Sequence, residues 1–529
     1  MPAWSLPAAL GAGAVALLIW NFSLGLRLSD LPETSKGFRV LSGLGAFLFL
    51  PALVIGLLAP TAPGARVLGP LAWLWPLVTA SIALQALWAF VISRASRAST
   101  LLIAVFNLLV AWVAATRWIV SVGGALPVWA LAPGVAVSSL ATAGLGDVVF
   151  PWGAALFMPA LASAAPARAR ITRVARALLA SGCALVVVCT ALALPRAFDT
   201  LSSTRALDVG SSDASARGEL AIGVRVFGTL AGPPSSATAR HDMALADSLG
   251  VTALHVELDP PAVTAGVLDS VARSIEPRRD SLLLVVTLTL GGRITPGEGA
   301  TARARQALIE RIVRRLRPDV LLPAERVTTG PGAPGADGWR AYYERAAATA
   351  RRVDRDVTVA LATDASSPAD SALADWVMAG GSRVDAVALA THDGAAEPRA
   401  FVAALNAVAR WASLARVMPD VWIVGVPTAP IVMGEVVQQQ LVRHALAWSA
   451  ARPWVRGVIA GDASDITAAA GLRTASGRAR RALADVAAAL RVQRDLTPAT
   501  TIPDTAAIAS DSAVRSVRSP TTTLPPPPR

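Results

Sequence analysis

Three carboxylate side chains stand out because each follows a short apolar run typical of a buried strand. They are Glu257, Glu325 and Asp462. A carboxylate at such a position can act as a general acid, a general base or a nucleophile. Glu325 ends the apolar run DVLLPAE, where burial would favour its protonated form and suit it to proton donation. We therefore expect Glu325 to be the acid/base candidate, with Glu257 and Asp462 as candidate partners.

Other polar residues follow the same kind of run. His392 and Asp393 come after the sixth run and are candidate substrate-binding residues. The remaining acidic residues fit the simpler role of capping the next helix or binding loop amides. These residues are Asp259, Asp364 and Asp465.

The apolar runs themselves predict a parallel (β/α)8 TIM barrel. Strands buried on both faces form near-continuous apolar runs, and the helical stretches between them imply right-handed βαβ units. The eight runs cover residues 221–228, 251–258, 281–290, 319–325, 356–363, 384–391, 421–428 and 455–462. Active sites of such barrels lie at the C-terminal ends of the strands, where the candidate residues fall.

Residues 1–196 predict a multi-pass transmembrane region. Six apolar runs there are each close to the ~20 residues needed to cross a bilayer. They are Leu6–Leu26, Val40–Leu58, Leu68–Val91, Leu101–Thr116, Val148–Ala165 and Ala177–Leu194. The first run has neither a basic n-region nor an A-x-A-like cleavage site, so we interpret it as a retained helix.

The stretch Trp118–Asp147 leaves two alternatives open, a seventh crossing or a re-entrant or interfacial segment, because glycines and prolines interrupt it. Basic residues in the loops 27–39, 94–97 and 168–176 favour six crossings. The positive-inside rule then places all three loops in the cytoplasm. We therefore expect an N-terminal bundle of about six helices and an extracytoplasmic barrel.

Changes in composition set the other boundaries. Residues 197–217 are polar and predict a linker, residues 218–492 form the barrel, and residues 493–529 predict a disordered Thr/Ser/Pro-rich tail. Lysine is nearly absent (only Lys36), while Arg and Ala are abundant. This bias indicates a high-GC bacterial gene, and we expect the protein in the bacterial inner membrane.

Charge and motifs exclude several classes of function. Residues 1–196 hold 12 Lys/Arg against 3 Asp/Glu, so membrane topology and lipid headgroups account for most of the net charge of +12. We expect no nucleic-acid partner. The sequence has no HExxH, P-loop or GxSxG motif, its four histidines form no spaced ligand set, and both cysteines lie in the last membrane run. We expect no metal and no cofactor.

Several segments resemble the (β/α)8-barrel glycoside hydrolases that retain anomeric configuration. RPDVLLPAERV (317–327), followed by WRAYYERAAATAR (339–351), is similar to their strand-four region, where the strand ends in Asn-Glu and the Glu is the acid/base. The segments 435–465 and 471–486 resemble the end of such barrels, and 223–228 with 244–256 resembles their first two strands. The resemblance covers about 250 residues and implies that Glu325 is the acid/base.

The chain departs from this family at two positions. Ala324 replaces the Asn before the acid/base, and the strand-seven nucleophile position falls at about Gly425 in VWIVGVPTAP. Retaining hydrolysis needs two carboxyls ~5–5.5 Å apart, and inverting hydrolysis needs ~6.5–9.5 Å. Glu435 follows strand seven, but its position predicts the start of the next helix, where it would interact with the helix dipole.

These departures favour a degenerate, glycosidase-like pseudoenzyme at the cell envelope, acting as a carbohydrate-binding or scaffold module. Its partners would be the lipid bilayer and a polysaccharide or glycan, with Trp339 as a candidate stacking residue. The first alternative is an active glycoside hydrolase that uses Glu325 with a relocated second carboxylate. The second is a transport or envelope-assembly role for the membrane region, where Asn21, Gln85 and Asn107 are the main polar residues.

Overall fold

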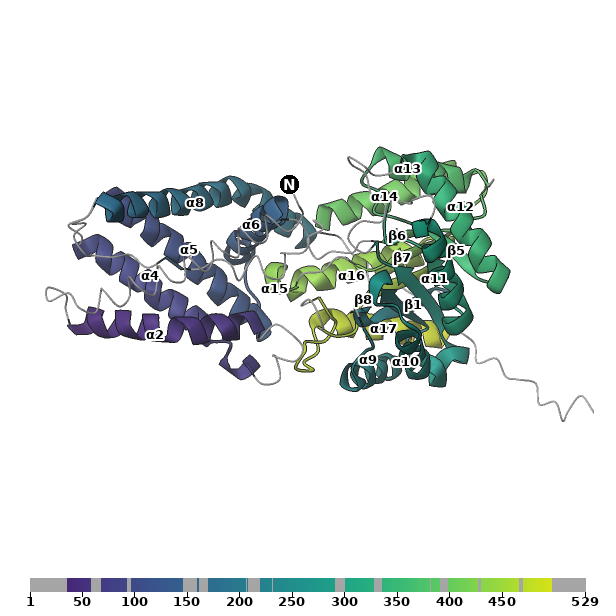
Figure 1. Ribbon diagram of the computed structural model, residues 1–529, viewed down its shortest axis with the longest axis horizontal. Coiled ribbons are helices and arrows are strands. Elements are labelled where there is room, and N and C mark those ends of the chain that lie inside the picture. Colours follow the sequence, from purple (N-terminus) through teal and green to yellow (C-terminus); the bar gives the residue numbers. More distant parts are fainter. Residues whose placement is uncertain are drawn as a thin grey trace, which may run out of the picture.

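A computed structural model describes the protein over most of its length. The described residues are 36–58, 68–92, 97–145, 159–160, 170–205, 207, 219–230, 232–290, 300–327, 335–380, 382–390, 398–426, 430–465 and 470–496. They form a group of long helices at one end of the molecule and a barrel of strands and helices at the other (Figure 1).

Eight parallel strands close into a barrel in the order β1 to β8, which confirms the TIM-barrel prediction. The strands are β1 (Ala221–Leu230), β2 (Ala253–Leu258), β3 (Leu283–Leu288), β4 (Val320–Leu322), β5 (Thr358–Thr363), β6 (Ala386–Ala390), β7 (Asp420–Val424) and β8 (Val455–Asp462). Since β1 pairs with both β2 and β8, residues far apart in the sequence become neighbours around the closure.

Helices surround the strands. They are α9 (Ser236–Leu249), α10 (Ala265–Ile275), α11 (Ala300–Leu316), α12 (Ala336–Val353), α13 (Pro368–Met378), α14 (Pro398–Leu414), α15 (Pro430–Met433), α16 (Glu435–Ala450) and α17 (Arg481–Leu496), with the short 3-10 turns η4 (Pro260–Ala262) and η5 (Glu276–Ser281). Local signals fix several boundaries. The Ser235 side chain caps α9, Gly250 ends it in the left-handed conformation, and Ser367 with Asp370 forms a capping box at α13.

Alternate residues of each strand face either the barrel interior or the helices. The interior layer is mostly small, with alanines from β1, β2, β5 and β6 around Val285, Leu322 and Trp422. An added Cβ on Gly457 would lie 2.2 Å from the Trp422 ring, so the indole fills the space beside this glycine. The other face of the strands joins a larger apolar cluster with the surrounding helices.

The N-terminal part contains α2 (Lys36–Leu58), the turn η1 (Gly69–Leu71), α4 (Leu74–Ile92), α5 (Arg97–Ser121), α6 (Val128–Leu145) and α8 (Arg170–Arg205). Within the described residues, three segments are long and apolar enough to cross a membrane: Gly69–Val91, Arg97–Ser121 and Arg176–Arg205. Two shorter apolar helical segments are Phe47–Gly56 and Val128–Ser139. The expected six-helix bundle stays a prediction, because Leu6–Leu26 and most of Val148–Ala165 lie outside the described residues.

Helix α8 continues further than the composition suggested. It passes through Pro195 and ends at Arg205, so residues 197–205, which the sequence analysis assigned to the linker, are helical. This extension lets the end of α8 pack on the barrel. Ala197 and Leu201 are buried in the same apolar cluster as the outer face of the barrel strands.

The helical part meets the barrel at the end where the strands terminate (Figure 1). Arg399, at the start of α14, donates to Ser203 Oγ at 3.0 Å and to the Asp199 carbonyl at 3.1 Å, both on α8. Buried apolar residues of both parts form one continuous cluster. Its members at this contact include Val120, Leu131, Val135 and Leu201 from the helical part, and Val432, Met433 and Val437 from the barrel.

Candidate functional site

An arginine inside the barrel joins two of the three candidate carboxylates. Arg225 on β1 forms ion pairs with Glu257 on β2 and with Asp462 on β8. Its Nη2 atom also donates to Asp462 Oδ2 at 2.9 Å, so the Asp462 contact is bidentate. Thr229 Oγ1 donates to the second oxygen of Glu257 at 2.9 Å. We call Arg225, Glu257 and Asp462 the interior ion cluster.

The closure of the barrel explains why these three residues meet. Strand β1 lies between β8 and β2, and in register Arg225 is opposite Asp462 on one side and His255 on the other. Alternation along β1 and β2 turns Arg225 and Glu257 to the interior, like Ala221 and Ala253 before them. The cluster therefore lies at the C-terminal end of the barrel interior.

The charges in the cluster are unequal, with two carboxylates around one guanidinium. Burial by itself would lower the pKa of Arg225, but attraction to Asp462 and Glu257 outweighs burial and raises this pKa above its ordinary value. Arg225 therefore remains a cation. Its side chain keeps 20% of its surface exposed, whereas Glu257 and Asp462 keep 5% and 10%. The guanidinium is therefore the most exposed member of the cluster.

Two polar residues continue the lining below the cluster. His255 on β2 and Thr287 on β3 are buried, and His255 Nε2 lies 2.8 Å from Thr287 Oγ1. The interior therefore changes from small apolar residues to polar ones towards the strand ends. Among the residues that the structure describes, no group of three or more His, Cys, Asp or Glu is placed to hold a metal ion.

A buried aspartate holds the two strand ends that carry Arg225 and Asp462. Asp242 on α9 accepts the backbone N–H of Phe227 at 2.8 Å and the hydroxyl of Ser464. Phe227 has a φ of +69°, which costs energy for a residue with a Cβ, so its N–H bond to Asp242 helps to maintain this conformation. Burial raises the pKa of Asp242.

Glu325 lies apart from this aspartate and follows β4, two strands from β2 around the barrel. The strand ends at Leu322, and residues 323–326 form a bend in which Glu325 is half-buried. The structure therefore brings Glu257 and Asp462 together through Arg225 and places Glu325 at another sector of the same barrel end.

The backbone beside Glu325 is held by a buried arginine. Arg305 on α11 is 5% exposed and donates to the Pro323 carbonyl at 3.0 Å and to Tyr342 Oη at 2.7 Å. Tyr342 in turn donates to the same carbonyl at 2.5 Å. These bonds fix the peptide two residues before Glu325, and with it the direction in which the chain leaves β4.

The sequence did not lead us to Arg225, Asp242 or Arg305, although the pattern of residues around each of them could have identified it. Arg225 interrupts an otherwise apolar strand run. Asp242 precedes Leu245, Ala246 and Leu249 at the i+3, i+4 and i+7 positions, which is the buried face of α9. Arg305 likewise precedes Leu308, Ile309 and Ile312 at the i+3, i+4 and i+7 positions, and all three are buried in the core. A charged residue on an apolar helix face is a candidate for a buried polar contact.

Strand seven has no carboxylate at its end, and its backbone disfavours one. Gly425 follows β7 with a φ of +90°, a conformation that residues with a side chain rarely adopt. A glutamate at this position would therefore be strained as well as absent. Glu435, the next acidic residue, begins α16, as the sequence analysis expected.

Trp339 was wrongly expected to stack on a saccharide. It is 1% exposed inside α12, and its ring packs on Tyr342 and Tyr343 with centroid distances of 5.7 and 6.2 Å. The apolar face of α12, with aromatics at i, i+3 and i+4, covers the barrel instead of facing solvent. The other two candidate binding residues, His392 and Asp393, lie outside the described residues.

Two of the other acidic residues at the strand ends, Asp364 and Asp465, bind loop amides as expected. Asp364 accepts the Ser366 N–H at 3.0 Å, whereas Asp259 makes no capping bond and accepts the Thr289 hydroxyl at 3.1 Å. Asp465 accepts the Gly471 N–H at 2.8 Å and forms a bidentate ion pair with Arg480 at 2.6 and 2.7 Å. These contacts hold the loops at the C-terminal end of the barrel.

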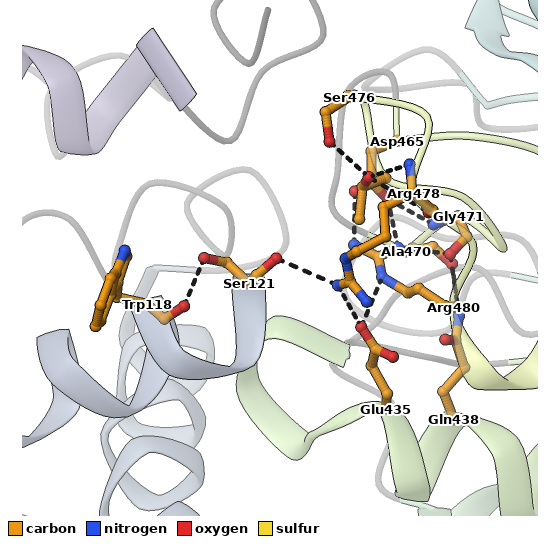
Figure 2. A network of polar contacts seen from close by, with 11 residues as sticks. Trp118, Ser121, Glu435, Gln438, Asp465, Ala470, Gly471, Ser476, Arg478 and Arg480 are labelled. Atoms are coloured by element: carbon orange, nitrogen blue, oxygen red, sulfur yellow. Dashed lines mark hydrogen bonds and ion pairs between the residues drawn. The ribbon is translucent and has the colours of Figure 1, made fainter. Parts of the chain in front are cut away.

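The Asp465–Arg480 pair belongs to a longer polar network that reaches the helical part (Figure 2). Arg480 lies 3.9 Å from Glu435, and Glu435 accepts a 2.5 Å hydrogen bond from Arg478. The Nη2 atom of Arg478 also donates to the carbonyl of Ser121 at 3.2 Å. The loop that follows Asp462 is thus connected directly to the end of α5.

Neither a family model nor a curated protein matches this chain. Among solved structures, a psychrophilic glycoside hydrolase family 10 endo-β-1,4-xylanase is 14% identical, with a TM-score of 0.37 over 52% of this chain and 98% of that chain. A GH5_18 variant from Streptomyces cattleya in complex with Manβ1-4GlcNAc is 18% identical, with a TM-score of 0.41 over 53% and 82%. A monomeric β-xylosidase from Caulobacter crescentus CB15 is 13% identical, with a TM-score of 0.39 over 51% and 67%. The barrel of this chain is established by its own strand pairing.

Proposed function

We propose that this protein is a membrane-anchored, extracytoplasmic barrel that binds a saccharide through the interior ion cluster without hydrolysing it. The observation that carries this proposal is the pairing of Arg225 with both Glu257 and Asp462. The guanidinium pairs with both carboxylates that could act as the partner of Glu325 in hydrolysis. The same arrangement places a partly exposed cation and several acceptor oxygens at the C-terminal end of the barrel, which suits recognition of sugar hydroxyls.

Strand seven supports the loss of turnover. The resemblance to retaining glycoside hydrolases requires a second carboxylate at about Gly425, where the chain has neither the side chain nor a backbone conformation that suits one. A saccharide-binding role uses the charged cluster as it stands, with no relocated nucleophile.

The second candidate is an active glycoside hydrolase with Glu325 as acid/base. It is favoured by the bonds from Arg305 and Tyr342 to the Pro323 carbonyl, which give the segment before Glu325 a fixed geometry. A fixed geometry is what a proton donor needs. A transport role has less support, because Asn107 directs its amide to the backbone of Ala160 at 2.6 and 2.9 Å and so holds the helical part together.

The test uses the full chain in lipid nanodiscs, because helices and barrel share one apolar cluster. Oligosaccharides of glucose, mannose, xylose and N-acetylglucosamine are titrated calorimetrically, and the matching aryl glycosides are assayed for hydrolysis. The variants are Glu325→Gln and, as a matched control, Glu310→Gln on the exposed surface of α11.

Binding without hydrolysis, unchanged in both variants, supports the saccharide-binding module. Hydrolysis that Glu325→Gln abolishes and Glu310→Gln preserves establishes the enzyme instead. The absence of both binding and hydrolysis overturns both candidates.

A further inference from the structure

We infer that the ligand of the barrel is a lipid-linked saccharide whose head group enters the barrel mouth directly from the bilayer surface. This inference rests on the proposed function and names the class of ligand for the same site. Three observations support it. They are the side of the barrel on which the interior ion cluster lies, the position of the helix ends relative to a bilayer, and the loop after β8 that connects the cluster to those helix ends.

The barrel presents its C-terminal end to the helical part. The contacts from the barrel come from residues that follow strands: Arg399 at the start of α14, α15 with Gly434, and Arg478 in the loop after β8. Leu131 of α6 lies 3.1 Å from the position of an added Cβ on Gly434. The interior ion cluster lies at this same end of the barrel, so it is on the side of the barrel that meets the helices and not on the side far from them (Figure 1).

The helices meet the barrel close to where they would leave a bilayer. Helix α5 has 25 residues, about 37 Å at 1.5 Å per residue, against a hydrocarbon core of about 30 Å. Its last residue, Ser121, already contacts Arg478 of the barrel. The helix exceeds the hydrocarbon core by only about 7 Å, so the distance left between the core and the barrel is at most about the depth of the lipid headgroups.

Exposed tryptophans mark the same level. Trp118 is in the last turn of α5, Trp129 is in the first turn of α6, and Trp73 precedes α4, which is joined to the start of α5 by a short connection. They are 36%, 61% and 43% exposed. Tryptophans are enriched at membrane–water interfaces, so these three side chains at the barrel end of the helices fit an interfacial belt.

The loop after β8 connects the interior ion cluster to this interface. Asp462 contributes its side chain to the cluster, and its carbonyl accepts the Leu472 N–H at 2.7 Å. From Leu472 the chain continues to Arg478, which contacts Ser121, one turn from Trp118 (Figure 2). One short segment thus borders both the ligand-binding mouth and the end of a membrane helix.

An amphiphile fits both parts of this arrangement at once. A sugar head group offers hydroxyls to Arg225, Glu257 and Asp462, and its lipid stays in the bilayer beside α5 and α6. A free polysaccharide in the surrounding water would have to reach the side of the barrel that meets the helices, which makes it the less suitable ligand.

The test varies the distance between sugar and bilayer. Disaccharides of glucose, mannose and N-acetylglucosamine are linked to dioleoylglycerol directly, or through polyethylene glycol spacers of increasing length, and placed in nanodiscs with the full chain. The same sugars are supplied as water-soluble methyl glycosides. Binding is followed by site-specific fluorescence on the barrel.

We expect the directly linked sugar to bind best and affinity to fall as the spacer lengthens, by at least about tenfold overall, because confinement at the mouth raises the effective concentration. Binding that appears only with long spacers, or equally well with the methyl glycosides, overturns the lipid-linked ligand but leaves saccharide binding intact. No binding in any form overturns the proposed function itself.

Discussion

Arg478, in the loop after β8, donates a hydrogen bond to the carbonyl of Ser121, the last residue of α5, 357 positions earlier in the chain. The same guanidinium pairs with Glu435, which is 8% exposed at the start of α16. One side chain thus joins the barrel to the helical part and neutralises a buried carboxylate. The relative placement of the two parts depends on specific polar contacts as well as on the shared apolar cluster.

Arg478→Ala should lower stability. It removes the bond to Ser121 and leaves Glu435 with Arg480 at 3.9 Å as its remaining cationic partner, a loss of about 1–3 kcal/mol. The apparent midpoint of thermal unfolding in detergent measures this effect. The matched control is Arg481→Ala, at an exposed position on α17. Equal midpoints for the two variants would show that the Arg478 contacts contribute nothing.

Arg225→Ala should be more damaging, because it removes the cation with which two mostly buried carboxylates, Glu257 and Asp462, both pair. Breaking a buried pair in this way typically costs about 3–5 kcal/mol. By comparison, Arg315→Ala removes a pair with Asp269 in which both side chains are about half exposed, and should cost less than about 1 kcal/mol. Chemical unfolding of the two variants gives the comparison, and a cost for Arg225→Ala as small as that for Arg315→Ala contradicts this account of the cluster.

The raised pKa of Asp242 predicts how the stability of the folded protein changes with pH. Its pKa in the folded protein lies above the ordinary 3.8, chiefly because of burial, so the folded state holds the proton more tightly than the unfolded state. Its contribution to stability is therefore greatest below 3.8 and is lost as pH rises through the elevated pKa. The charge of the nearby Asp462 also raises the pKa of Asp242, whereas His241 lowers it.

Asp242→Asn isolates this contribution, because an amide is neutral at every pH and keeps an oxygen for the Phe227 N–H. The unfolding midpoints of wild type and variant are compared at pH 4 and pH 8. We expect wild type to lose stability relative to Asp242→Asn at the higher pH. A relative gain for wild type on going to pH 8 would reverse the predicted sign.

The orientation of the barrel can be tested by cysteine labelling in a background where Cys183 and Cys189 are replaced by alanine. Asp337→Cys, on the exposed surface of α12, should react with a membrane-impermeant maleimide in intact cells. Arg97→Cys, at the far end of α5 from the barrel, should react only after the cells are opened. Labelling of both, or the opposite order, contradicts an extracytoplasmic barrel.

The barrel could be predicted from sequence because its strands are buried on both faces, which leaves eight apolar runs separated by helical patterns. Their ends were less predictable. The fourth run was expected to reach Glu325, but the strand stops at Leu322, since Pro323 has no N–H to continue the ladder. Helix α8 continues to Arg205, although composition indicated that a linker begins at residue 197. The first boundary depends on a residue within the run, and the second on the packing of the end of α8 against the barrel.

The site was only partly predictable for a related reason. Glu257 and Asp462 were recognised from their positions at strand ends, but Arg225, which joins them, lies inside a strand run. Contact across the β1 closure depends on barrel register, which one sequence does not specify. Trp339 is not available for stacking because it shares the apolar, buried face of α12 with Tyr342 and Tyr343.

The most direct test of a saccharide-binding barrel is calorimetric titration of the full chain, in nanodiscs, with the best-binding sugar of the panel. Wild type is compared with Glu257→Gln, which keeps the shape of the side chain but removes its charge, and with Glu310→Gln. We predict at least about a tenfold loss of affinity for Glu257→Gln, the size expected when a charged hydrogen-bond partner is removed, and no change for Glu310→Gln. Unchanged affinity in Glu257→Gln, or hydrolysis of the sugar that Glu325→Gln abolishes, would contradict the account.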